Sequence, residues 1–410
     1  MTSSTTFVIV GGGLAGAKAV EALRDSDFDG KIILVADEKH LPYERPPLSK
    51  EYLAGKKSLA EFTVHESDWY RDHDVDLRLN ARVESLDPAT RTAGFADGAT
   101  VRYDKLLLAT GSAPRRPPIP GSDSAGVYYL RSYDDAVELN SVLTEGSSLA
   151  VVGAGWIGLE VAAGARQRGV NVAVVESASQ PLSAALGAEV GKVFADLHRE
   201  HKVELRLDTG VEEIAVDDGA ARGLKLADGS TVAADAVLVA VGAKPNIGLA
   251  EQAGLELADG GVLVDASLRT SDPNIYAVGD IAAAEHPVFG TRIRTEHWAN
   301  ALKQPAVAVA GMLGDPGEYA ELPYFFTDQY DLGMEYVGHS AGFDGVVFRG
   351  DVAGREFLAF WLDGDGRVIA GMNVNIWDVL DEVKELIRSR HPVDAGCLGD
   401  PQLPLGGLTN

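Results

Sequence analysis

The chain carries the same glycine-rich pattern twice, each time directly after a short apolar run. The first copy occupies residues 11–16, the second occupies residues 153–158, and both read G-x-G-x-x-G. In a βαβ unit the first glycine permits a tight turn, the second lets the backbone approach a diphosphate, and the third lets helix and strand pack closely. Two copies therefore predict two dinucleotide-binding units, each built on a parallel sheet.

Each copy is followed by an acidic residue that closes a second apolar run. Asp37 follows the run at 32–36, and Glu176 follows the run at 172–175. A carboxylate at this spacing accepts hydrogen bonds from a ribose. One glycine pattern alone could be an ordinary turn in a chain with 46 glycines. The combination of strand, glycines, helix and acid favours nucleotide binding.

Composition limits the chemistry that the chain can perform by itself. Cys397 is the single cysteine among 410 residues, so we expect no internal disulfide, no redox-active cysteine pair and no iron–sulfur cluster held by this chain. Redox chemistry then requires a bound organic cofactor. The nine histidines are dispersed and show no metal-ligand spacing, so we expect no metal site.

Charge and hydropathy limit the partners and the location. A net charge of −25 argues against nucleic acid and anionic membranes, because either would be repelled. No apolar stretch reaches the length that spans a bilayer, and residues 1–6 do not have the pattern of a signal peptide. We therefore expect a cytoplasmic protein that has neither a membrane nor a nucleic acid as its partner.

The two glycine patterns head segments of similar layout. After each pattern we expect a helix, at residues 15–25 and 157–167, and each segment ends in a buried apolar run, at residues 105–109 and 236–241. The second segment also carries a helical pattern at 189–200. The internal duplication therefore extends from the motif to the whole unit.

Two further segments have distinct patterns. Paired prolines in residues 42–50 predict a rigid extended stretch, followed by a helix around 49–54. From residue 323 the apolar period changes to two, which predicts an antiparallel meander and then a closing helix at 377–390. The four strands expected in this meander are residues 332–337, 345–349, 357–362 and 368–373.

Shorter motifs outside the glycine turns resemble those of a known family. Residues 109–111 (ATG), 241–246 (VGAKPN) and 277–280 (AVGD) resemble the two-dinucleotide-binding flavoprotein reductases, which have a glutathione reductase-like fold. Four narrower marks are similar to the putidaredoxin reductase and dioxygenase ferredoxin reductase family, and the resemblance covers essentially the whole chain. These marks are residues 46–50 (PPLSK), 129–132 (YLRS), 156–160 (WIGLE) and 326–330 (FTDQY).

The resemblance implies an α/β fold with two Rossmann-like dinucleotide-binding domains and a C-terminal α+β domain. It implies that residues 1–110 and 242–322 together bind FAD. Residues 111–241 would form the NAD-binding domain, and residues 323–410 the C-terminal domain.

The resemblance assigns the first glycine pattern to FAD. Asp37 would bind the adenosine ribose, Asp280 the ribityl chain, and Lys50 would lie beside the isoalloxazine. Without the motif around it, Lys50 would be interpreted as a solvated helix lysine. The residues implied for FAD are Gly11, Gly13, Ala15, Gly16, Asp37, Lys50, Val83, Arg131, Asp280 and Trp298.

The resemblance assigns the second glycine pattern to the nicotinamide dinucleotide, with Glu176 on the adenosine ribose. The segment 176–180 contains this acid and no arginine, so a 2′-phosphate would be repelled and NADH is favoured over NADPH. Glu160 would pair with Lys50 close to the nicotinamide, and these two are the expected catalytic residues. The residues implied for NADH are Gly153, Gly155, Ile157, Gly158, Glu160, Glu176 and Gly242.

The activity that the resemblance implies is an FAD-dependent NADH:ferredoxin oxidoreductase. It would pass electrons from NADH through FAD, one at a time, to a two-iron two-sulfur ferredoxin that supplies a monooxygenase or a dioxygenase. An acidic ferredoxin would dock near Arg292, Arg294 and Lys303. The sequence leaves a monomer or a dimer open.

Other activities fit parts of the pattern. Thiol-based flavoenzymes carry a cysteine soon after the first βαβ unit, where this chain has Ser49 and no cysteine. The alternatives that remain are a rubredoxin reductase, a monodehydroascorbate reductase, and a flavoprotein of the apoptosis-inducing type with nucleotide-switched interactions.

Overall fold

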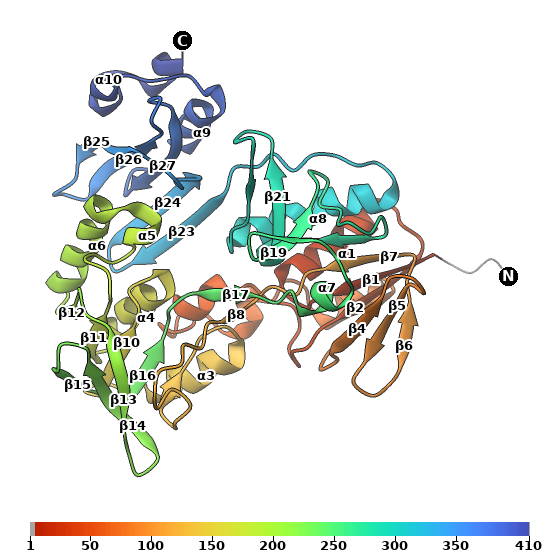
Figure 1. Cartoon of the computed structure of the whole chain (residues 1–410), viewed down its shortest axis with the longest axis horizontal. Helices are drawn as coiled ribbons and strands as arrows, with labels where there is room; N and C mark the ends of the chain where they lie inside the picture. Colours follow the sequence, from red (N-terminus) through yellow and green to blue (C-terminus); the bar gives the residue numbers. More distant parts are fainter. Residues whose placement is uncertain (1–4, 410) are drawn as a thin grey trace. The chain divides into compact units, whose positions relative to one another are not determined.

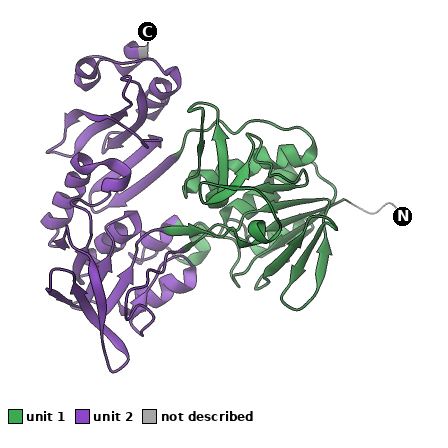
Figure 2. Cartoon of the chain, viewed as in Figure 1, with its two compact units in different colours: residues 1–45, 58–113, 243–323 green, residues 46–57, 114–242, 324–410 purple. Residues whose placement is uncertain are grey.

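The structure is a computed structural model that describes residues 5–409. The chain folds into two compact units, each assembled from three separate segments (Figure 2). Unit 1 comprises Met1–Arg45, Ser58–Ala113 and Ala243–Pro323, and unit 2 comprises Pro46–Lys57, Pro114–Gly242 and Tyr324–Asn410. The four-segment domain division stays a prediction, since the second and fourth segments fall in one unit.

Unit 1 is built on a five-stranded parallel sheet in the order β20-β7-β1-β2-β3 (Figure 1). Its strands are β1 (Thr6–Val10), β2 (Lys31–Val35), β3 (Val75–Arg78), β7 (Lys105–Leu108) and β20 (Ile275–Ala277). Strands β1, β2, β7 and β20 are apolar and almost continuously buried, as expected where a parallel sheet is covered on both faces, whereas the edge strand β3 is half-buried and carries Asp76 and Arg78. Helix α1 (Leu14–Asp25) packs on β1 and β2, and helix α8 (Trp298–Leu313) packs on α1 and β20.

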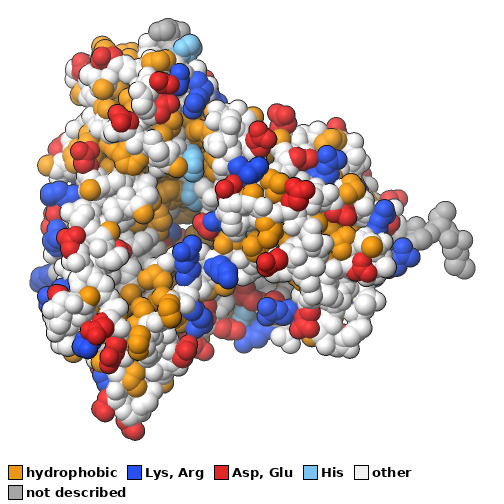
Figure 3. Space-filling view, viewed as in Figure 1, with side chains coloured by type: hydrophobic (Ala, Val, Ile, Leu, Met, Phe, Trp, Pro, Cys, Tyr) orange, Lys and Arg blue, Asp and Glu red, His pale blue; other side chains and the backbone are white. Residues whose placement is uncertain are grey.

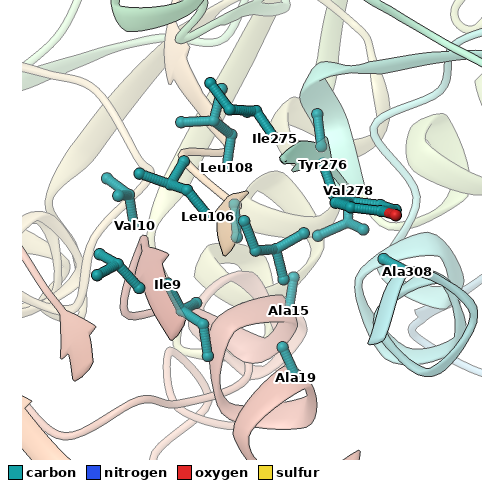
Figure 4. Close-up of a cluster of buried hydrophobic side chains, with 14 of the residues drawn as sticks. Ile9, Val10, Ala15, Ala19, Leu106, Leu108, Ile275, Tyr276, Val278 and Ala308 are labelled. Carbon is teal, nitrogen blue, oxygen red and sulfur yellow. The ribbon is translucent and has the colours of Figure 1, made fainter. Parts of the chain in front are cut away.

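The core of unit 1 lies between this sheet and these helices. Ile9 and Tyr276 lie on the face of the sheet that Ala15 and Ala308 approach from the two helices (Figure 4). Leu106 and Ile275 lie on the opposite face, because successive side chains of a strand alternate between the two faces. Small alanines on the helices let the backbone come close to the sheet, because interiors are close-packed. This packing places the start of α1 at the carboxyl end of β1.

Smaller sheets complete unit 1. The antiparallel sheet β4-β5-β6 contains a turn at residues 97–98, and a further sheet has the order β18-β19-β21-β22. Their strands are β4 (Val83–Asp87), β5 (Thr92–Phe95), β6 (Thr100–Arg102), β18 (Leu257–Ala258), β19 (Gly261–Val264), β21 (Ala282–His286) and β22 (Thr291–Ile293). The short helices α2 (Ser67–Asp72) and α7 (Gly248–Gln252) lie in the connections.

Unit 2 contains the second parallel sheet, in the order β12-β11-β10-β16-β9. Its strands are β9 (Val127–Tyr128), β10 (Ser148–Val152), β11 (Asn171–Val175), β12 (Glu204–Arg206) and β16 (Ala236–Val239). The helices of this part are α3 (Tyr133–Val142), α4 (Trp156–Gln167), α5 (Ser183–Leu186) and α6 (Ala188–Glu200). A three-stranded antiparallel sheet joins it, formed by β13 (Val211–Asp217), β14 (Ala220–Leu226) and β15 (Thr231–Ala233).

The C-terminal part of unit 2 is an antiparallel sheet in the order β23-β24-β27-β26-β25. Its strands are β23 (Tyr324–Gln329), β24 (Leu332–Gly338), β25 (Gly345–Asp351), β26 (Glu356–Leu362) and β27 (Val368–Val374). The expected simple meander was wrong, because β24 pairs with β27 and not with β25. A strand of period two specifies which face is buried but not which neighbour it takes.

Two helix predictions also differ from the structure. The expected helix at 49–54 is replaced by a 3₁₀ turn, η1 (Pro46–Ser49), and hydrogen-bonded turns, in which the Lys50 and Tyr52 N–H groups both donate to the Pro47 carbonyl. A stretch this short does not hold an α-helix by local hydrogen bonds alone. The closing helix α9 (Leu380–Ser389) begins after residue 377, and Trp377 lies half exposed before it. The short helix α10 (Ala395–Gly399) follows.

The face of the molecule shown in Figure 3 carries side chains of both charges. Acidic and basic side chains are interspersed over the face of each unit in Figure 3. Among residues 5–409 there is no helix that is long and apolar enough to cross a membrane.

Candidate active site

The first glycine turn leads from β1 into α1. Gly11 has a φ of +129°, and a Cβ there would lie 2.1 Å from the carbonyl oxygen of Ala109 on the neighbouring strand end. Gly16 packs against the same turn, with a Cβ position 1.9 Å from the Gly11 oxygen. Gly13 is the N-cap of α1 and meets no atom within 4 Å, and no side chain caps the helix. An uncapped helix start beside open space fits a diphosphate, because its N–H groups need an acceptor.

The second turn repeats this geometry between β10 and α4. A Cβ at Gly153 would lie 2.6 Å from the Ala240 oxygen, and one at Gly158 would lie 2.2 Å from the Gly153 oxygen. Gly155 is the N-cap of α4, meets no atom within 4 Å, and receives no side-chain cap. The residues of both turns therefore fit a dinucleotide on the same physical grounds.

The two acidic residues differ in their surroundings. Asp37 is 65% exposed and pairs with Arg82 at 3.4 Å. Glu176 is held against its own glycine turn, because one carboxylate oxygen accepts from the Ala154 N–H at 2.8 Å and the other accepts from the Ala178 N–H at 2.9 Å. The Glu176 carboxylate is therefore oriented before any ribose binds.

Asp280 lies beyond the carboxyl end of β20. It sits in the 3₁₀ turn η3 (Gly279–Ile281) and is 8% exposed. The Gly279 N–H donates to the buried Gln304 on α8 at 2.7 Å, which holds this turn. The indole of Trp298, the first residue of α8, donates to Glu44 at 2.9 Å. Ligands bind at such strand ends in open α/β sheets.

The remaining residues expected at the flavin lie in different units. Val83 and Ala15 are buried in the core of unit 1. Lys50 and Arg131 belong to unit 2, where the Arg131 N–H donates to Asp135 at 3.0 Å.

Two further residues are expected in the NADH site, one inside the glycine pattern and one after β16. Ile157 is in the first turn of α4, with its side chain 42% exposed. Gly242 has a φ of +103°, and its carbonyl accepts from the Arg115 N–H at 2.9 Å.

Arg45 is a residue of this region that the sequence analysis missed. Its guanidinium bonds to Glu38 at 2.7 Å and to the Tyr43 hydroxyl at 3.2 Å. Burial lowers the pKa of Arg45, but the charges of Tyr43, Glu38 and Asp280 outweigh burial and hold the pKa above its ordinary value. The sequence feature that could have pointed to Arg45 is its position directly before the paired prolines of the motif at 46–50.

Lys50 and Glu160 form a buried ion pair in unit 2. The Lys50 ammonium lies 2.9 Å from Glu160 Oε1, and the two side chains are 9% and 6% exposed. The ammonium also lies 5.0 Å from the ring centroid of Phe326. The hydroxyls of Ser49 and Thr327 donate to the same carboxylate, at 2.5 and 2.6 Å. Glu160 thus accepts from three donors, which stabilises the buried charge. Sequence reasoning did not select Ser49 or Thr327.

Asp328 lies beside this pair and is affected by it. Burial raises the pKa of Asp328; Lys50 opposes the rise, whereas Glu51, Glu160 and Glu335 add to it. Asp328 therefore lies among acidic groups, and Lys50 is the cation that opposes their effect.

The basic residues expected at a docking surface each have an acidic neighbour in unit 1. Arg292 lies 3.6 Å from Asp259, Arg294 lies 2.5 Å from Glu296, and Lys303 lies 3.2 Å from Glu321. Their charges are therefore locally compensated, which weakens their long-range attraction for an acidic partner.

His198 is fully buried on α6, and its Nε2 lies 2.8 Å from Gln329 Oε1. Burial is the largest effect and lowers the pKa of His198 to about 4, although the bond to Gln329 opposes it and His201 adds to it. Folded protein therefore keeps this imidazole neutral at physiological pH.

This low pKa predicts that stability falls in mild acid. Below pH 6.5 the unfolded chain protonates His198 while the folded chain does not, so the free energy of unfolding should fall by about 2 kcal/mol from pH 7 to pH 5 through this group alone. Urea unfolding of the wild type and of His198→Gln at both pH values isolates the contribution, because other groups titrate alike in both proteins. An equal pH dependence in the two proteins would contradict the prediction.

No group of histidine, cysteine and acidic side chains that could hold a metal ion occurs in the part of the chain that the structure describes.

Two family models cover nearly the whole chain. Residues 5–305 match the pyridine nucleotide-disulphide oxidoreductase family, and residues 324–409 match the reductase C-terminal family. The predicted α/β fold, with two Rossmann-like units and a C-terminal α+β part, is confirmed by this match and by the solved structures that resemble it.

Individual relatives align over almost their full lengths. The chain is 39% identical to the anthranilate 1,2-dioxygenase system ferredoxin–NAD(+) reductase component of Burkholderia cepacia, covering 98% of this chain and 97% of the relative. It is 40% identical to rhodocoxin reductase of Rhodococcus erythropolis, covering 90% and 86%.

The structure superposes on putidaredoxin reductase, solved as a covalent complex with putidaredoxin, with a TM-score of 0.95 at 34% identity, covering 99% of this chain and 98% of that chain. The chain therefore belongs to the pyridine nucleotide-disulphide oxidoreductase family, and within it to the ferredoxin reductases similar to putidaredoxin reductase.

Proposed function

We propose that the chain is an FAD-dependent NADH:ferredoxin reductase that passes electrons one at a time to a two-iron two-sulfur ferredoxin serving a monooxygenase or dioxygenase. The observation that carries this proposal is the pair of glycine turns, each opening on an uncapped helix start. The names of the relatives support the acceptor, since they are reductase components of oxygenase systems or reductases of small redox proteins. The single cysteine, Cys397, supports a route without a thiol.

The first turn is proposed to hold FAD. The N–H groups at the start of α1 would bind the diphosphate, and Asp37 would accept from the adenosine ribose. Asp280 would bind the ribityl chain. Bound FAD supplies the step that protein side chains cannot, since it takes up two electrons as a hydride and gives them up singly. Val83, Arg131 and Trp298 are proposed to complete the flavin pocket.

The second turn is proposed to hold NADH. Gly153, Gly155 and Gly158 admit the diphosphate, and Glu176 accepts from the adenosine ribose while repelling a 2′-phosphate. Ile157 and Gly242 would border the nucleotide. Glu160 is proposed to hold Lys50 in place for the hydride transfer, whose demands on the protein are position and electrostatics.

Replacing Glu176 with alanine should weaken NADH binding about tenfold, because a charge-assisted hydrogen bond contributes about 1.5–3 kcal/mol and part of it is recovered by water. The dissociation constant of NADH, from quenching of protein fluorescence, is the measurement. Asp208→Asn is the matched control, since it removes a nearby exposed acid that does not touch the turn. Equal affinities for the Glu176→Ala variant and the wild type would remove Glu176 from the site.

We propose that ferredoxin docks near Arg292, Arg294 and Lys303. On binding, these basic side chains would leave their acidic neighbours or would contact the ferredoxin as well. We also propose a cytoplasmic location, which the use of NADH supports, and either a monomer or a dimer.

The function is tested by anaerobic mixing of the purified, FAD-loaded protein with NADH in a stopped-flow spectrometer. We expect the flavin absorbance near 450 nm to bleach, and a two-iron two-sulfur ferredoxin to reoxidise the flavin. Failure of NADH to bleach the flavin overturns the proposal. Faster turnover with rubredoxin or with the ascorbate radical would favour those alternatives instead.

A further inference from the structure

A chain of buried polar side chains runs through unit 2 to Glu160. His198 on α6 bonds to Gln329 Oε1 at 2.8 Å, and Gln329 Nε2 donates to Thr327 Oγ1 at 3.3 Å. Thr327 Oγ1 then donates to Glu160 Oε1 at 2.6 Å. Gln329 and Thr327 lie on the same face of β23, two residues apart, and β23 lies beside α4, which carries Glu160 (Figure 1). His198, Gln329 and Thr327 are each at most 1% exposed.

The hydrogen atoms in this chain all point toward Glu160. The Thr327 hydroxyl has one hydrogen and gives it to the carboxylate, so its oxygen is available as an acceptor for the Gln329 amide N–H. The Gln329 carbonyl oxygen then faces His198, which must donate through Nε2–H. His198 Nδ1 has no hydrogen-bond partner among the described residues. In a neutral imidazole that donates from Nε2, Nδ1 carries no hydrogen, so no donor is left unpaired there. The tautomer of His198 is thereby determined.

A merely structural contact would not need this arrangement. Unit 2 buries large apolar side chains elsewhere, such as Trp361, Phe360 and Phe194, all fully buried. Apolar residues at the three positions would fill the space without the cost of desolvating polar groups. Instead, the hydrogen bonds from His198 through Gln329 and Thr327 all run in one direction, and they end at the buried ion pair of Glu160 with Lys50.

We propose that Gln329 and His198 are positioning residues of the hydride-transfer site. They direct the Thr327 hydroxyl at Glu160, which fixes the carboxylate and the Lys50 ammonium in one orientation. This inference rests on the proposed function and adds to it three residues that act at a distance from the glycine turns. Neither Gln329 nor His198 bonds to Gly153, Gly155 or Glu176, so the chain acts on the hydride step rather than on binding of the dinucleotide.

The first test is a double-mutant cycle between Gln329 and Thr327, measured as the limiting rate of flavin reduction by NADH in single turnover. Gln329→Leu and Thr327→Val should each lower this rate five- to tenfold and change the dissociation constant of NADH less than twofold. If Gln329 acts through Thr327, the double variant is no slower than Thr327→Val alone. Additive losses, or equal losses in rate and affinity, overturn the proposal.

The second test uses His198. Gln at this position places an amide N–H near the place of Nε2–H, so His198→Gln should stay within twofold of the wild-type rate, whereas His198→Met should fall five- to tenfold. His201→Gln is the matched control. His201 lies at the same end of α6 and stacks on Tyr330 at 3.6 Å, but it takes no part in the hydrogen bonds from His198 to Glu160. Equal rates for His198→Gln and His198→Met overturn the proposal, as does an equal loss with His201→Gln.

A third measurement does not depend on turnover. Two-bond ¹H–¹⁵N spectra of histidine-labelled protein should show His198 with a protonated Nε2 and an unprotonated Nδ1 from pH 6 to pH 8, in the wild type. If His198 has the opposite tautomer, or titrates within this range, the proposed row of hydrogen bonds from His198 to Glu160 is contradicted. If the wild-type flavin is not reduced by NADH, the proposed function fails and this inference with it. If the wild type is reduced but Gln329→Leu matches it in rate, only this inference fails.

Discussion

Replacing Gly11 with alanine is expected to leave little stably folded protein and no bound FAD. The added Cβ would lie 2.1 Å from the Ala109 oxygen and 2.5 Å from its carbonyl carbon, and both are backbone atoms that no side-chain rotation can move. The backbone φ of +129° is a region that residues with a Cβ rarely adopt. Backbone strain at residue 11 and displacement of the Ala109 carbonyl together should lower the free energy of unfolding by about 4 kcal/mol or more. A typical protein has a total stability of about 5–15 kcal/mol.

The measurement is urea unfolding of the Gly11→Ala variant together with the FAD content after gel filtration. Gly13→Ala is the matched control within the same turn, since a Cβ there meets no atom within 4 Å and the φ is −92°. The control should fold with wild-type stability in the absence of FAD but bind FAD more weakly, because the open space is where the diphosphate is proposed to lie. Wild-type stability of Gly11→Ala would contradict the role assigned to the close approach.

The second large effect is expected from Lys50→Met, which leaves the Glu160 carboxylate buried without its counterion. Removing one partner of a buried pair typically costs about 3–5 kcal/mol, because an uncompensated charge remains in the interior. Ser49 and Thr327 continue to donate to Glu160, so we expect a value near the lower end. The rate of flavin reduction by NADH should fall as well, since Lys50 is proposed to act at the flavin.

The double variant Lys50→Met with Glu160→Gln separates the charge from the packing. A neutral amide at residue 160 leaves no buried charge: its oxygen can accept from the Thr327 hydroxyl, while its NH₂ group donates to the Ser49 oxygen in place of accepting from it. The double variant should therefore recover at least half of the stability lost in Lys50→Met. Activity should not recover, because the pair is absent. Chemical denaturation at pH 7 measures the first expectation and single-turnover reduction the second. A loss below about 1 kcal/mol in Lys50→Met would mean that water reaches Glu160.

The parallel sheets were predictable because their signals are local. The strand at residues 105–109 is β7 (Lys105–Leu108), and the helix at 157–167 is α4 (Trp156–Gln167). A continuous apolar run identifies a strand buried on both faces, and the glycine turn identifies where the helix starts.

The order of strands in the C-terminal sheet was not predictable from the pattern. Any of the strands β24 to β27 presents a suitable apolar face, and the pairing of β24 with β27 depends on long-range packing. The helix expected after the paired prolines failed for the opposite reason. It was a local prediction, and a six-residue stretch makes too few consecutive hydrogen bonds to hold an α-helix by itself.

The chain of His198, Gln329 and Thr327 could not be found in the sequence at all. Gln329 and Thr327 belong to a motif that the sequence analysis quoted, but His198 is 131 residues from Gln329 along the chain. A histidine in an amphipathic helix can be exposed or buried and can have many hydrogen-bond partners. Its partner here is decided only by the burial of His198 against β23. Tertiary structure likewise determined that Lys50 is not solvated, because Glu160 lies 110 residues away in the sequence.

The sequence by itself determined the two nucleotide turns, their acidic partners and the absence of a thiol near the first unit, since each of these depends on residue type and short spacing. Only the tertiary structure decided which polar side chains are buried together, because burial sets both the strength of an ion pair and the direction of each hydrogen bond. Lys50, Glu160, Thr327 and Gln329 come from three segments of the chain, and they become one site only when β23 packs on α4.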